Sequence, residues 1–336
     1  MKPSVSDRPI WDVWLAAFHA PTLAIADELG VFTALAATPA TADELATTLQ
    51  VESRATESML GLLAALGFLA RSGAAFELNE VARTYLLPAS EYYWGGFLRR
   101  IRTIPIDCDR LVEALRRGRA AQDARVSGTL WRAPQPPAEA LVGFTHAMHS
   151  HSFALARRVV TSFGLTPGSR FLDVAGGSGS YSIAAALDVE GLHATVLDLP
   201  AVCDVTRAYA EKHGVADRVT AMAGDMFGDA PWPSGATDLF FSDIFHDWDD
   251  ERCAQLARRA FEALAPGGRI LVHEMTLDET KDGPLNAIAY SMVMVFVTEG
   301  RQRTVAELFA LLRGAGFADP EVATTAEGYR LISARK

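Results

Sequence analysis

Several features that would assign this chain to a special class of protein are scarce or missing. Its three cysteines, Cys108, Cys203 and Cys253, lie far apart without CxxC spacing, so we expect reduced thiols and no zinc cluster. No run reaches the ~18 uncharged apolar residues of a membrane helix, and the first residues contain no apolar signal core. We therefore expect a cytoplasmic protein without a membrane partner.

The chain also lacks an excess of positive charge. Lys and Arg number 31 against 41 Asp and Glu, a formal net charge of −10 that disfavours nucleic acid as a partner. There is no internal repeat and no low-complexity tract. Hydrophobic residues make up 49% of the 336 residues, which is enough for about two packed domains and excludes a disordered chain.

The first part of the chain, residues 1–135, has the pattern of a mainly helical domain. Residues 11–35 carry apolar side chains at three- and four-residue steps, interrupted at Pro21. Thr41 followed by Glu44 predicts a capping box. We expect Ser53 to cap the next helix, over residues 54–66.

A short hairpin over residues 68–78 completes a helix–turn–helix–wing pattern, which often binds DNA. The second helix offers only Arg54 as a cation, beside Glu57, whereas a recognition helix needs several donors for bases and phosphates. We therefore interpret this part as a packing or dimerisation module. A homodimer is expected because four large apolar residues recur at helical spacing in a segment too short to bury them: Trp11, Trp14, Leu15 and Phe18.

From Phe171 onward, short apolar runs alternate with helical stretches, the pattern of an α/β domain with a parallel sheet. The runs FLDVA, ATVLDL, VTAMAG, DLFFSDI and RILVHEM predict buried strands, and YRLISARK predicts a closing strand. A Pro-rich break at 131–137 precedes a helix over about 138–163. We therefore divide the chain into a helical domain (1–135), a linking helix (136–164) and a catalytic domain (165–336).

The clearest motif is FLDVAGGSGSYS, at residues 171–182. A buried strand ends near Asp173, and Gly176, Gly177 and Gly179 then form a tight turn into a helix. Glycine permits positive φ and a close approach of the backbone to a ligand. By itself, such a turn is also compatible with an ordinary loop between a strand and a helix.

Acidic residues at the ends of the next two strands make a binding site the better interpretation. A carboxylate at Asp198 is placed to accept hydrogen bonds from ribose hydroxyls, and Asp225 is followed by Met226 and Phe227, which can cover a flat base. A dinucleotide fingerprint would need a third glycine where Ser182 stands, and no Walker lysine follows. The pattern favours an adenosine ligand without phosphates.

Taken together, these runs resemble the class I S-adenosylmethionine (SAM) methyltransferases, and in particular small-molecule O-methyltransferases with an N-terminal dimerisation domain. Six motifs occur in the family's order: DVAGGSG, LDLP, GDMF, HDWDD, ALAPGGRILVHE and GRQRT. The resemblance implies a Rossmann-like α/β domain with a mostly parallel seven-stranded sheet. It also implies a preceding winged-helix-like, mainly α dimerisation domain, SAM as cofactor, and a homodimer.

The resemblance also implies which residues bind SAM. The glycines would approach its methionine part, Asp198 would hold the ribose, and Asp225 with Met226 would frame the adenine. Ser242 stands where many family members carry a lysine near the adenine. The full set of implied cofactor contacts is Asp173, Gly176, Gly177, Gly179, Asp198, Leu199, Asp225, Met226, Phe227 and Ser242.

A histidine, His246, follows the fourth strand at the edge where open α/β sheets bind ligands. A neutral imidazole there can take a proton from a phenol or enol, although a histidine at that position can also cap the helix that begins near Asp249. The resemblance favours the base. It implies that Glu274 orients the histidine, and we expect this carboxylate to displace the pKa of His246 upward.

The resemblance also implies a second carboxylate beside the histidine, and here the chain departs from the family. In GRQRT, residues 300–304, Gln302 stands where the family's GxERT motif has Glu. Glutamine can form a hydrogen bond to an imidazole but cannot stabilise an imidazolium by charge. Glu299 is a candidate substitute. The catalytic residues expected are therefore His246, Glu274 and Gln302.

The segment THAMHSHS places His146, His149 and His151 where family members wall the acceptor pocket. Together with His246 and Asp247 they suggest a metal site, but on a helix His151 points away from the other two, and we expect no metal. Apolar residues of such a pocket are equally compatible with core packing. The expected substrate contacts are Phe144, Met148, His149, Asp247, Met292 and Phe296.

The function predicted first is methyl transfer from SAM to a hydroxyl of a small, aromatic secondary metabolite, as in antibiotic biosynthesis. One alternative, suggested by Gln302 and the histidines, is C-methylation beside the carbonyl of a 2-oxo acid, with His246 as base or as metal ligand. A second alternative is a non-catalytic regulator that binds SAM or DNA. The sequence does not identify the acceptor, because the residues that shape a pocket are scattered over the chain.

Overall fold

The computed structural model describes residues 3–103, 106–118, 120, 137–326 and 328–336. These residues form two compact units, Met1–Pro105 and Ile106–Lys336. The domain boundary expected near residue 135 lies outside the described residues, so that division stays a prediction. Among the described helices, none alone has the length and apolar composition to cross a membrane, and one bent pair (8–28 with 31–37) meets that test by length and composition only.

The first unit contains seven helices among its described residues, and its core is formed by buried residues of α2 to α7 and the hairpin. The predicted capping box of Thr41 and Glu44 is confirmed at the start of α4. The expected cap Ser53 is wrong: Glu52 caps α5, its carboxylate accepting from the Ala55 N–H, and Ser53 is the first helical residue. The helices are α1 (Arg8–Ala16), α2 (His19–Glu28), α3 (Val31–Ala37), α4 (Ala42–Leu49), α5 (Ser53–Ala65), α6 (Glu80–Tyr85) and α7 (Gly95–Thr103).

A hairpin of β1 (Leu69–Ser72) and β2 (Ala75–Leu78) follows α5, as predicted. The likeness to a winged helix stays a prediction. The break between α1 and α2 falls at residues 17–18 rather than at Pro21, because proline is tolerated in the first turn of α2. Helix α1 buries no residue in the described structure, and Trp11 and Trp14 meet edge to face on its exposed surface.

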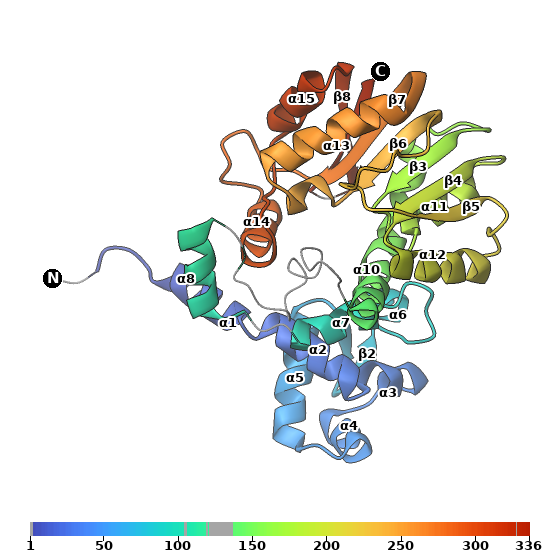
Figure 1. Ribbon diagram of the computed structural model, residues 1–336. Helices are drawn as coiled ribbons and strands as arrows, with labels where there is room; N and C mark the ends of the chain where they lie inside the picture. The colour runs from blue at the N-terminus through green and yellow to red at the C-terminus, as the bar shows by residue number, and fades with distance from the viewer. Residues whose placement is uncertain (1–2, 104–105, 119, 121–136, 327) are drawn as a thin grey trace. The chain divides into compact units, whose positions relative to one another are not determined.

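The second unit is built on a seven-stranded sheet in the order β5-β4-β3-β6-β7-β9-β8, which confirms the predicted α/β fold (Figure 1). All neighbouring pairs are parallel except those that involve β9, which is antiparallel to both β7 and β8. The strands are β3 (Arg170–Val174), β4 (His193–Asp198), β5 (Val219–Ala223), β6 (Ala236–Ser242), β7 (Leu264–Met275), β8 (Ala318–Ala326) and β9 (Tyr329–Arg335).

Helices pack along this sheet in two groups. Helices α11 and α12 contact β3, β4 and β5, with α10 against both, whereas α13 and α15 contact each other and the β7–β9 side (Figure 1). Helix α8 packs on α14 within this unit. The helices are α8 (Cys108–Arg117), α10 (Ala138–Val159), α11 (Ser180–Asp188), α12 (Pro200–Lys212), α13 (Asp250–Ala263), α14 (Leu285–Val297) and α15 (Val305–Gly314), with short 3₁₀ turns η1 (Val160–Phe163) and η2 (Phe245–Asp247).

This strand order determines where polar side chains gather. Strand β3 pairs in parallel with β4 on one side and β6 on the other, so the order in which the chain adds strands to the sheet reverses beside it. Ligands of open α/β sheets bind at such a point, outside the carboxyl ends of the strands. The residues that end these strands, Asp198 and Ser242, therefore lie at one edge with the turn that follows β3.

Candidate active site

The glycine turn after β3 is shaped by a buried carboxyl group. Asp173 is buried, and its Oδ2 accepts from the Ser182 hydroxyl at 2.8 Å. A Cβ atom on Gly176 would lie 2.6 Å from each carboxylate oxygen of Asp173, so a side chain there is excluded. Gly177 and Gly179 have φ of +59° and +75°, and a Cβ on Gly177 would meet nothing within 4 Å. The turn is thus tight on its inner side and open beside Gly177.

Asp198 faces this turn from the end of β4. Its Oδ2 accepts from the Gly177 N–H at 2.8 Å, and its Oδ1 accepts from the Leu199 N–H at 2.7 Å. Burial raises the pKa of Asp198 to about 6, and burial also raises the pKa of Asp173 to about 7. The structure therefore brings together four residues predicted to bind the cofactor: Asp173, Gly177, Asp198 and Leu199.

The remaining predicted cofactor residues are arranged less uniformly. Asp225 is exposed, and its Oδ1 accepts from the Phe227 N–H at 2.8 Å. Met226 and Phe227 pack on the core, and the Phe227 ring lies 4.7 Å from Trp248, edge to face. Ser242 lies at the end of β6 with its hydroxyl 3.4 Å from His273 Nδ1, a polar neighbour that the sequence interpretation did not include.

His246 lies in η2, the turn that follows β6, and only 4% of it is exposed. Its Nδ1 is 3.3 Å from Glu274 Oε2 and 3.0 Å from Gln302 Nε2, so the structure brings the three predicted catalytic residues together. Its Nε2 is 3.6 Å from Asp247 Oδ1. The Tyr290 ring of α14 meets the imidazole edge to face at 5.2 Å.

Glu274, at the end of β7, holds the backbone of this turn as well as facing the imidazole. Its Oε1 accepts from the Ile244 N–H at 3.1 Å and from the Phe245 N–H at 2.9 Å. Burial, together with the neighbouring Asp243 carboxylate, raises the pKa of Glu274 well above its ordinary value.

The expected upward displacement of the His246 pKa is wrong. Burial, with smaller contributions from the Arg303 and His151 charges, lowers the pKa of His246 to about 3. The physical reason is that burial removes the imidazole from water and so penalises its charged form. Burial also raises the pKa of the neighbouring Asp247 to about 8.

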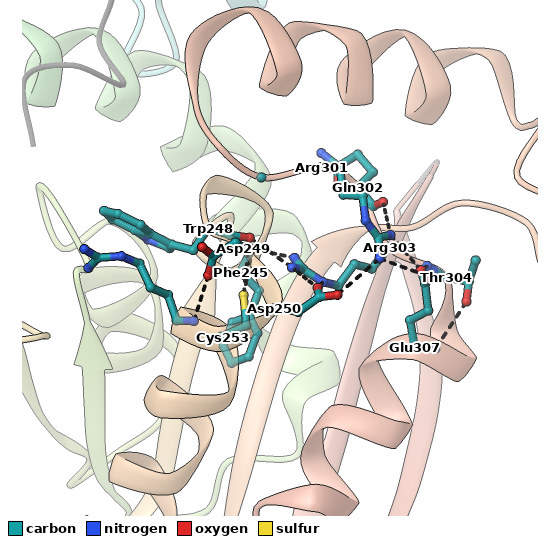
Figure 2. A network of polar contacts seen from close by, with 12 residues as sticks. Phe245, Trp248, Asp249, Asp250, Cys253, Arg301, Gln302, Arg303, Thr304 and Glu307 are labelled. Carbon is teal, nitrogen blue, oxygen red and sulfur yellow. Dashed lines mark hydrogen bonds and ion pairs between the residues drawn. The ribbon is translucent and has the colours of Figure 1, made fainter. Parts of the chain in front are cut away.

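Arg303, in the segment that carries Gln302, forms hydrogen bonds to the backbone of the histidine turn, an arrangement that we call the clamp (Figure 2). Arg303 donates to the Phe245 carbonyl at 2.6 Å, to the Trp248 carbonyl at 2.9 Å and to Asp250 Oδ1 at 2.7 Å. Cys253 donates its thiol to the Phe245 carbonyl as well, at 3.2 Å. The Arg303 side chain is only 3% exposed, so these bonds are largely shielded from water.

Two neighbours of Arg303 complete the clamp. A Cβ on Gly300 would overlap the His246 carbonyl oxygen and lie 2.6 Å from backbone atoms of Asp247 and Trp248. Thr304 begins α15 with a capping box to Glu307, which fixes the end of the segment. Glu299, the candidate substitute for the missing glutamate, forms an ion pair with Arg252, its Oε1 lying 3.4 Å from Arg252 Nε.

The histidines of α10 do not gather around His246. His149 is buried, lies 2.9 Å from Ser178 Oγ through its Nδ1, and stacks on Tyr209 at 3.6 Å between ring centroids. It therefore supports the glycine turn, although the sequence placed it in the acceptor pocket. His151, which the sequence set aside, is the α10 histidine whose charge acts on His246. His146 is exposed and pairs with the Tyr209 hydroxyl at 3.0 Å.

Other predicted substrate residues lie on two helices of this unit. Phe144 and Met148 are half-buried on α10, Met292 is exposed on α14, and Phe296 is buried there. Asp247 lies beside the predicted base, with its Oδ1 3.6 Å from His246 Nε2. The assignment of Phe144, Met148, Met292 and Phe296 to the acceptor stays a prediction.

One group in the described residues has the spacing of metal ligands. One polar atom from each of Asp243, His246 and Glu274 lies within 4.8 Å of the others, a spacing that an ion can bridge. The sequence interpretation missed Asp243, Tyr290, Gly300 and Arg303 as neighbours of the histidine turn. A signal for two of them was present, because Gly300 and Arg303 belong to the GRQRT motif that drew attention to Gln302.

Comparison with known proteins decides the family. Residues 109–318 match the family model of an O-methyltransferase domain, and residues 11–88 match that of an O-methyltransferase dimerisation domain. This chain belongs to the O-methyltransferase family. The methyltransferase is SAM-dependent, as its relatives are.

Individual relatives cover nearly the whole methyltransferase. It is 32% identical to 3-hydroxy-5-methyl-1-naphthoate 3-O-methyltransferase of Streptomyces sahachiroi, over 91% of this chain and 88% of that protein. It is 31% identical to acetylserotonin O-methyltransferase of Gallus gallus, over 92% and 91%. The solved structure of human N-acetylserotonin methyltransferase in complex with SAM superposes with a TM-score of 0.84 at 28% identity, covering 100% and 99% of the two chains.

Proposed function

We propose that this methyltransferase transfers the methyl group of SAM to a hydroxyl of a small aromatic secondary metabolite, with His246 as the general base. The arrangement of His246 carries the proposal: its Nδ1 faces Glu274 and Gln302, whereas its Nε2 faces Asp247 on the other side of the ring. Relatives whose names specify naphthoate and acetylserotonin acceptors support an aromatic substrate. The comparisons give no support to a C-methyltransferase or to a non-catalytic regulator.

The residues at the glycine turn fit SAM. The turn is open beside Gly177, and the Asp198 carboxylate next to it is held by two backbone N–H groups with lone pairs left for ribose hydroxyls. Asp225, Met226 and Phe227 follow strand β5, Ser242 ends strand β6, and these residues would complete the adenine side. When bound, SAM supplies a methyl group already activated on a sulfonium.

The chain's own contribution is to align the acceptor hydroxyl and remove its proton. Burial keeps the His246 imidazole neutral at physiological pH, which is the form that accepts a proton. Glu274 holds the turn by two backbone hydrogen bonds, and Arg303 holds it by two more from the opposite side. The base is therefore presented on a rigid support rather than on a free loop.

We also infer a homodimer formed through the first unit and a cytoplasmic location. The match to a dimerisation domain supports the dimer, as do the exposed apolar residues of α1, which has no buried residue of its own. The three cysteines are free thiols, and Cys253 donates hydrogen bonds as one, which suits a reducing compartment.

The test of the base is a His246→Ala variant assayed on a panel of phenolic acceptors. We expect turnover to fall by roughly 10²–10⁴, the usual contribution of a positioned base, while the Kd for SAM by calorimetry stays within about twofold. His193→Ala, at an exposed histidine that begins β4, serves as the matched control and should keep full turnover. A His246→Ala enzyme that retains normal turnover would refute the assignment.

A further inference from the structure

Two carboxyl oxygens near one nitrogen of His246 have no hydrogen-bond donor among the described residues. They are Asp243 Oδ1 and Glu274 Oε2, and the amide oxygen of Gln302, whose nitrogen faces the same ring atom, also lacks a donor. Asp243 Oδ1 is 3.7 Å from His246 Nδ1, and Glu274 Oε2 is 3.3 Å from it. Buried acceptors without a donor are costly, so their convergence on one atom calls for a physical account.

A proton on Nδ1 faces both carboxyl oxygens: Glu274 Oε2 is the nearer, at 3.3 Å, and Asp243 Oδ1, at 3.7 Å, interacts with it through charge. The Gln302 amide, 3.0 Å from Nδ1, fits in two orientations related by half a turn, and one of them lets its oxygen accept this proton. With the hydrogen on Nδ1, the lone pair of a neutral imidazole is on Nε2, beside Asp247. The surroundings of Nδ1 therefore select the tautomer that a general base needs.

Asp243 is held in this position at the expense of its backbone conformation. It has φ of +54°, in the left-handed region that side chains other than glycine adopt rarely. Its N–H donates to the His273 carbonyl at 3.1 Å, and its Oδ2 accepts from the Tyr329 hydroxyl at 3.1 Å. Strained residues of this kind concentrate at functional sites, where the surrounding structure holds them in place.

We propose that Asp243 is a positioning residue for His246 and replaces the carboxylate that Gln302 lacks. The inference rests on the proposed role of His246 as base. Asp243 and Glu274 face Nδ1 from the ends of two neighbouring strands, whereas the family's GxERT motif would place a glutamate at residue 302. The second carboxylate thus lies after strand β6, at residue 243, rather than before helix α15, at residue 302.

The electrostatics agree with this assignment. Burial raises the pKa of Asp243 to about 7, and burial together with the Asp243 charge raises the pKa of Glu274, so the protonation of each carboxyl group depends on the other. A negative charge on Asp243, 3.7 Å from Nδ1, favours the imidazolium that forms when the base takes its proton. The other titratable groups facing this site are Tyr181, Asp247, Tyr290, Arg303, Tyr329 and His151.

The experiment compares Asp243→Asn, Gln302→Glu and the double variant. Asparagine tolerates positive φ and still bonds Tyr329, so Asp243→Asn removes the charge with the least change in structure. We expect its kcat to fall roughly 10- to 100-fold, as for loss of an opposite charge within ~4 Å of the imidazolium, with the acceptor KM and the SAM Kd within about twofold. In the double variant, the carboxylate introduced by Gln302→Glu should raise kcat at least about tenfold above that of Asp243→Asn.

A second readout does not depend on activity. In protein labelled with ¹⁵N-histidine, NMR distinguishes Nδ1–H from Nε2–H tautomers. We expect His246 to carry its proton on Nδ1 in the unmodified enzyme, to shift toward Nε2–H in Asp243→Asn, and to return in the double variant. A merely structural role for Asp243 would not produce rescue from residue 302.

Several outcomes would overturn the inference. These are normal kcat in Asp243→Asn, an unchanged His246 tautomer, no rescue by Gln302→Glu, or a stoichiometric metal ion in the purified protein that is lost in Asp243→Asn. His246→Ala is measured in parallel. If it keeps full turnover, the proposed base fails; if it is inactive while Asp243→Asn is normal, only the role of Asp243 fails.

Discussion

The clamp formed by Arg303 is the feature whose removal should most affect stability (Figure 2). Replacing Arg303 by Met keeps the side-chain length but deletes the donors to the Phe245 and Trp248 carbonyls, at 2.6 and 2.9 Å. Hydrogen bonds from a charged donor contribute about 1.5–3 kcal/mol each. The Cys253 thiol still donates to both carbonyls, at 3.2 and 3.6 Å, although only weakly.

We therefore expect Arg303→Met to lower the free energy of unfolding by about 3 kcal/mol. This value is the low end of the range for two such hydrogen bonds, because the Cys253 thiol remains as a donor and the Asp250 partner is exposed. For a unit of this size, such a loss lowers Tm by roughly 6–12 °C at ~2–4 °C per kcal/mol. Turnover should also fall, because the backbone on both sides of His246 is released. Thermal unfolding followed by circular dichroism measures the first effect.

Arg301 is the matched control, two residues earlier in the same segment. Its side chain is 37% exposed and pairs with Glu307 at 2.9 Å, an arrangement that contributes under about 1 kcal/mol. Arg301→Met should thus lower Tm by no more than about 4 °C. Equal shifts for the two variants would refute the reasoning from burial. Arg303→Lys should recover only part of the loss, because one ammonium group does not reach both carbonyls and Asp250 together.

Three further predictions concern the cofactor site, the histidine turn and assembly. Because the pKa of Asp198 in the protein without SAM is about 6, the affinity for SAM should rise with pH through about 6, as the carboxylate ionises, and then level off. Calorimetry on Asp198→Asn should find weaker binding without this pH dependence. A flat pH profile in the unmodified enzyme would contradict the prediction. Gly300→Ala should reduce kcat at least about tenfold, because its Cβ overlaps the His246 carbonyl; Gly314→Ala, whose Cβ meets nothing within 4 Å, should leave kcat unchanged. Light scattering should return about twice the 36.2 kDa chain mass, and Trp14→Glu should shift it to one chain while Val322→Glu on β8 does not; a monomer at micromolar concentration in the unmodified protein speaks against the dimer.

The sequence by itself determined the architecture of the second unit. Buried parallel strands are continuous apolar runs, and the runs at Phe171, Ala194 and Leu239 are all strands in the structure. Residues fixed by local backbone needs were equally predictable. Gly176 has no room for a side chain beside Asp173, and the Thr41–Glu44 pair satisfies the first N–H groups of a helix.

The sequence also identified His246 and its partners in GRQRT and VHEM, because strand ends in a parallel sheet meet at one edge. It did not predict which way each side chain faces. His149 and His151 are two residues apart on α10, yet one supports the glycine turn through Ser178 and the other acts on His246. That choice depends on the rotation of α10 against α11 and α12.

Only the tertiary structure decided the electrostatics of the site. From the sequence, Glu274 beside His246 implied a raised histidine pKa, but burial reverses the sign, because an imidazole removed from water disfavours its charged form. Asp243 showed no sequence signal of its role, since its contact with Nδ1 arises from a positive φ at the end of β6. Desolvation and long-range contacts are properties of the folded chain, so the sequence pattern located the site and the packing determined its chemistry.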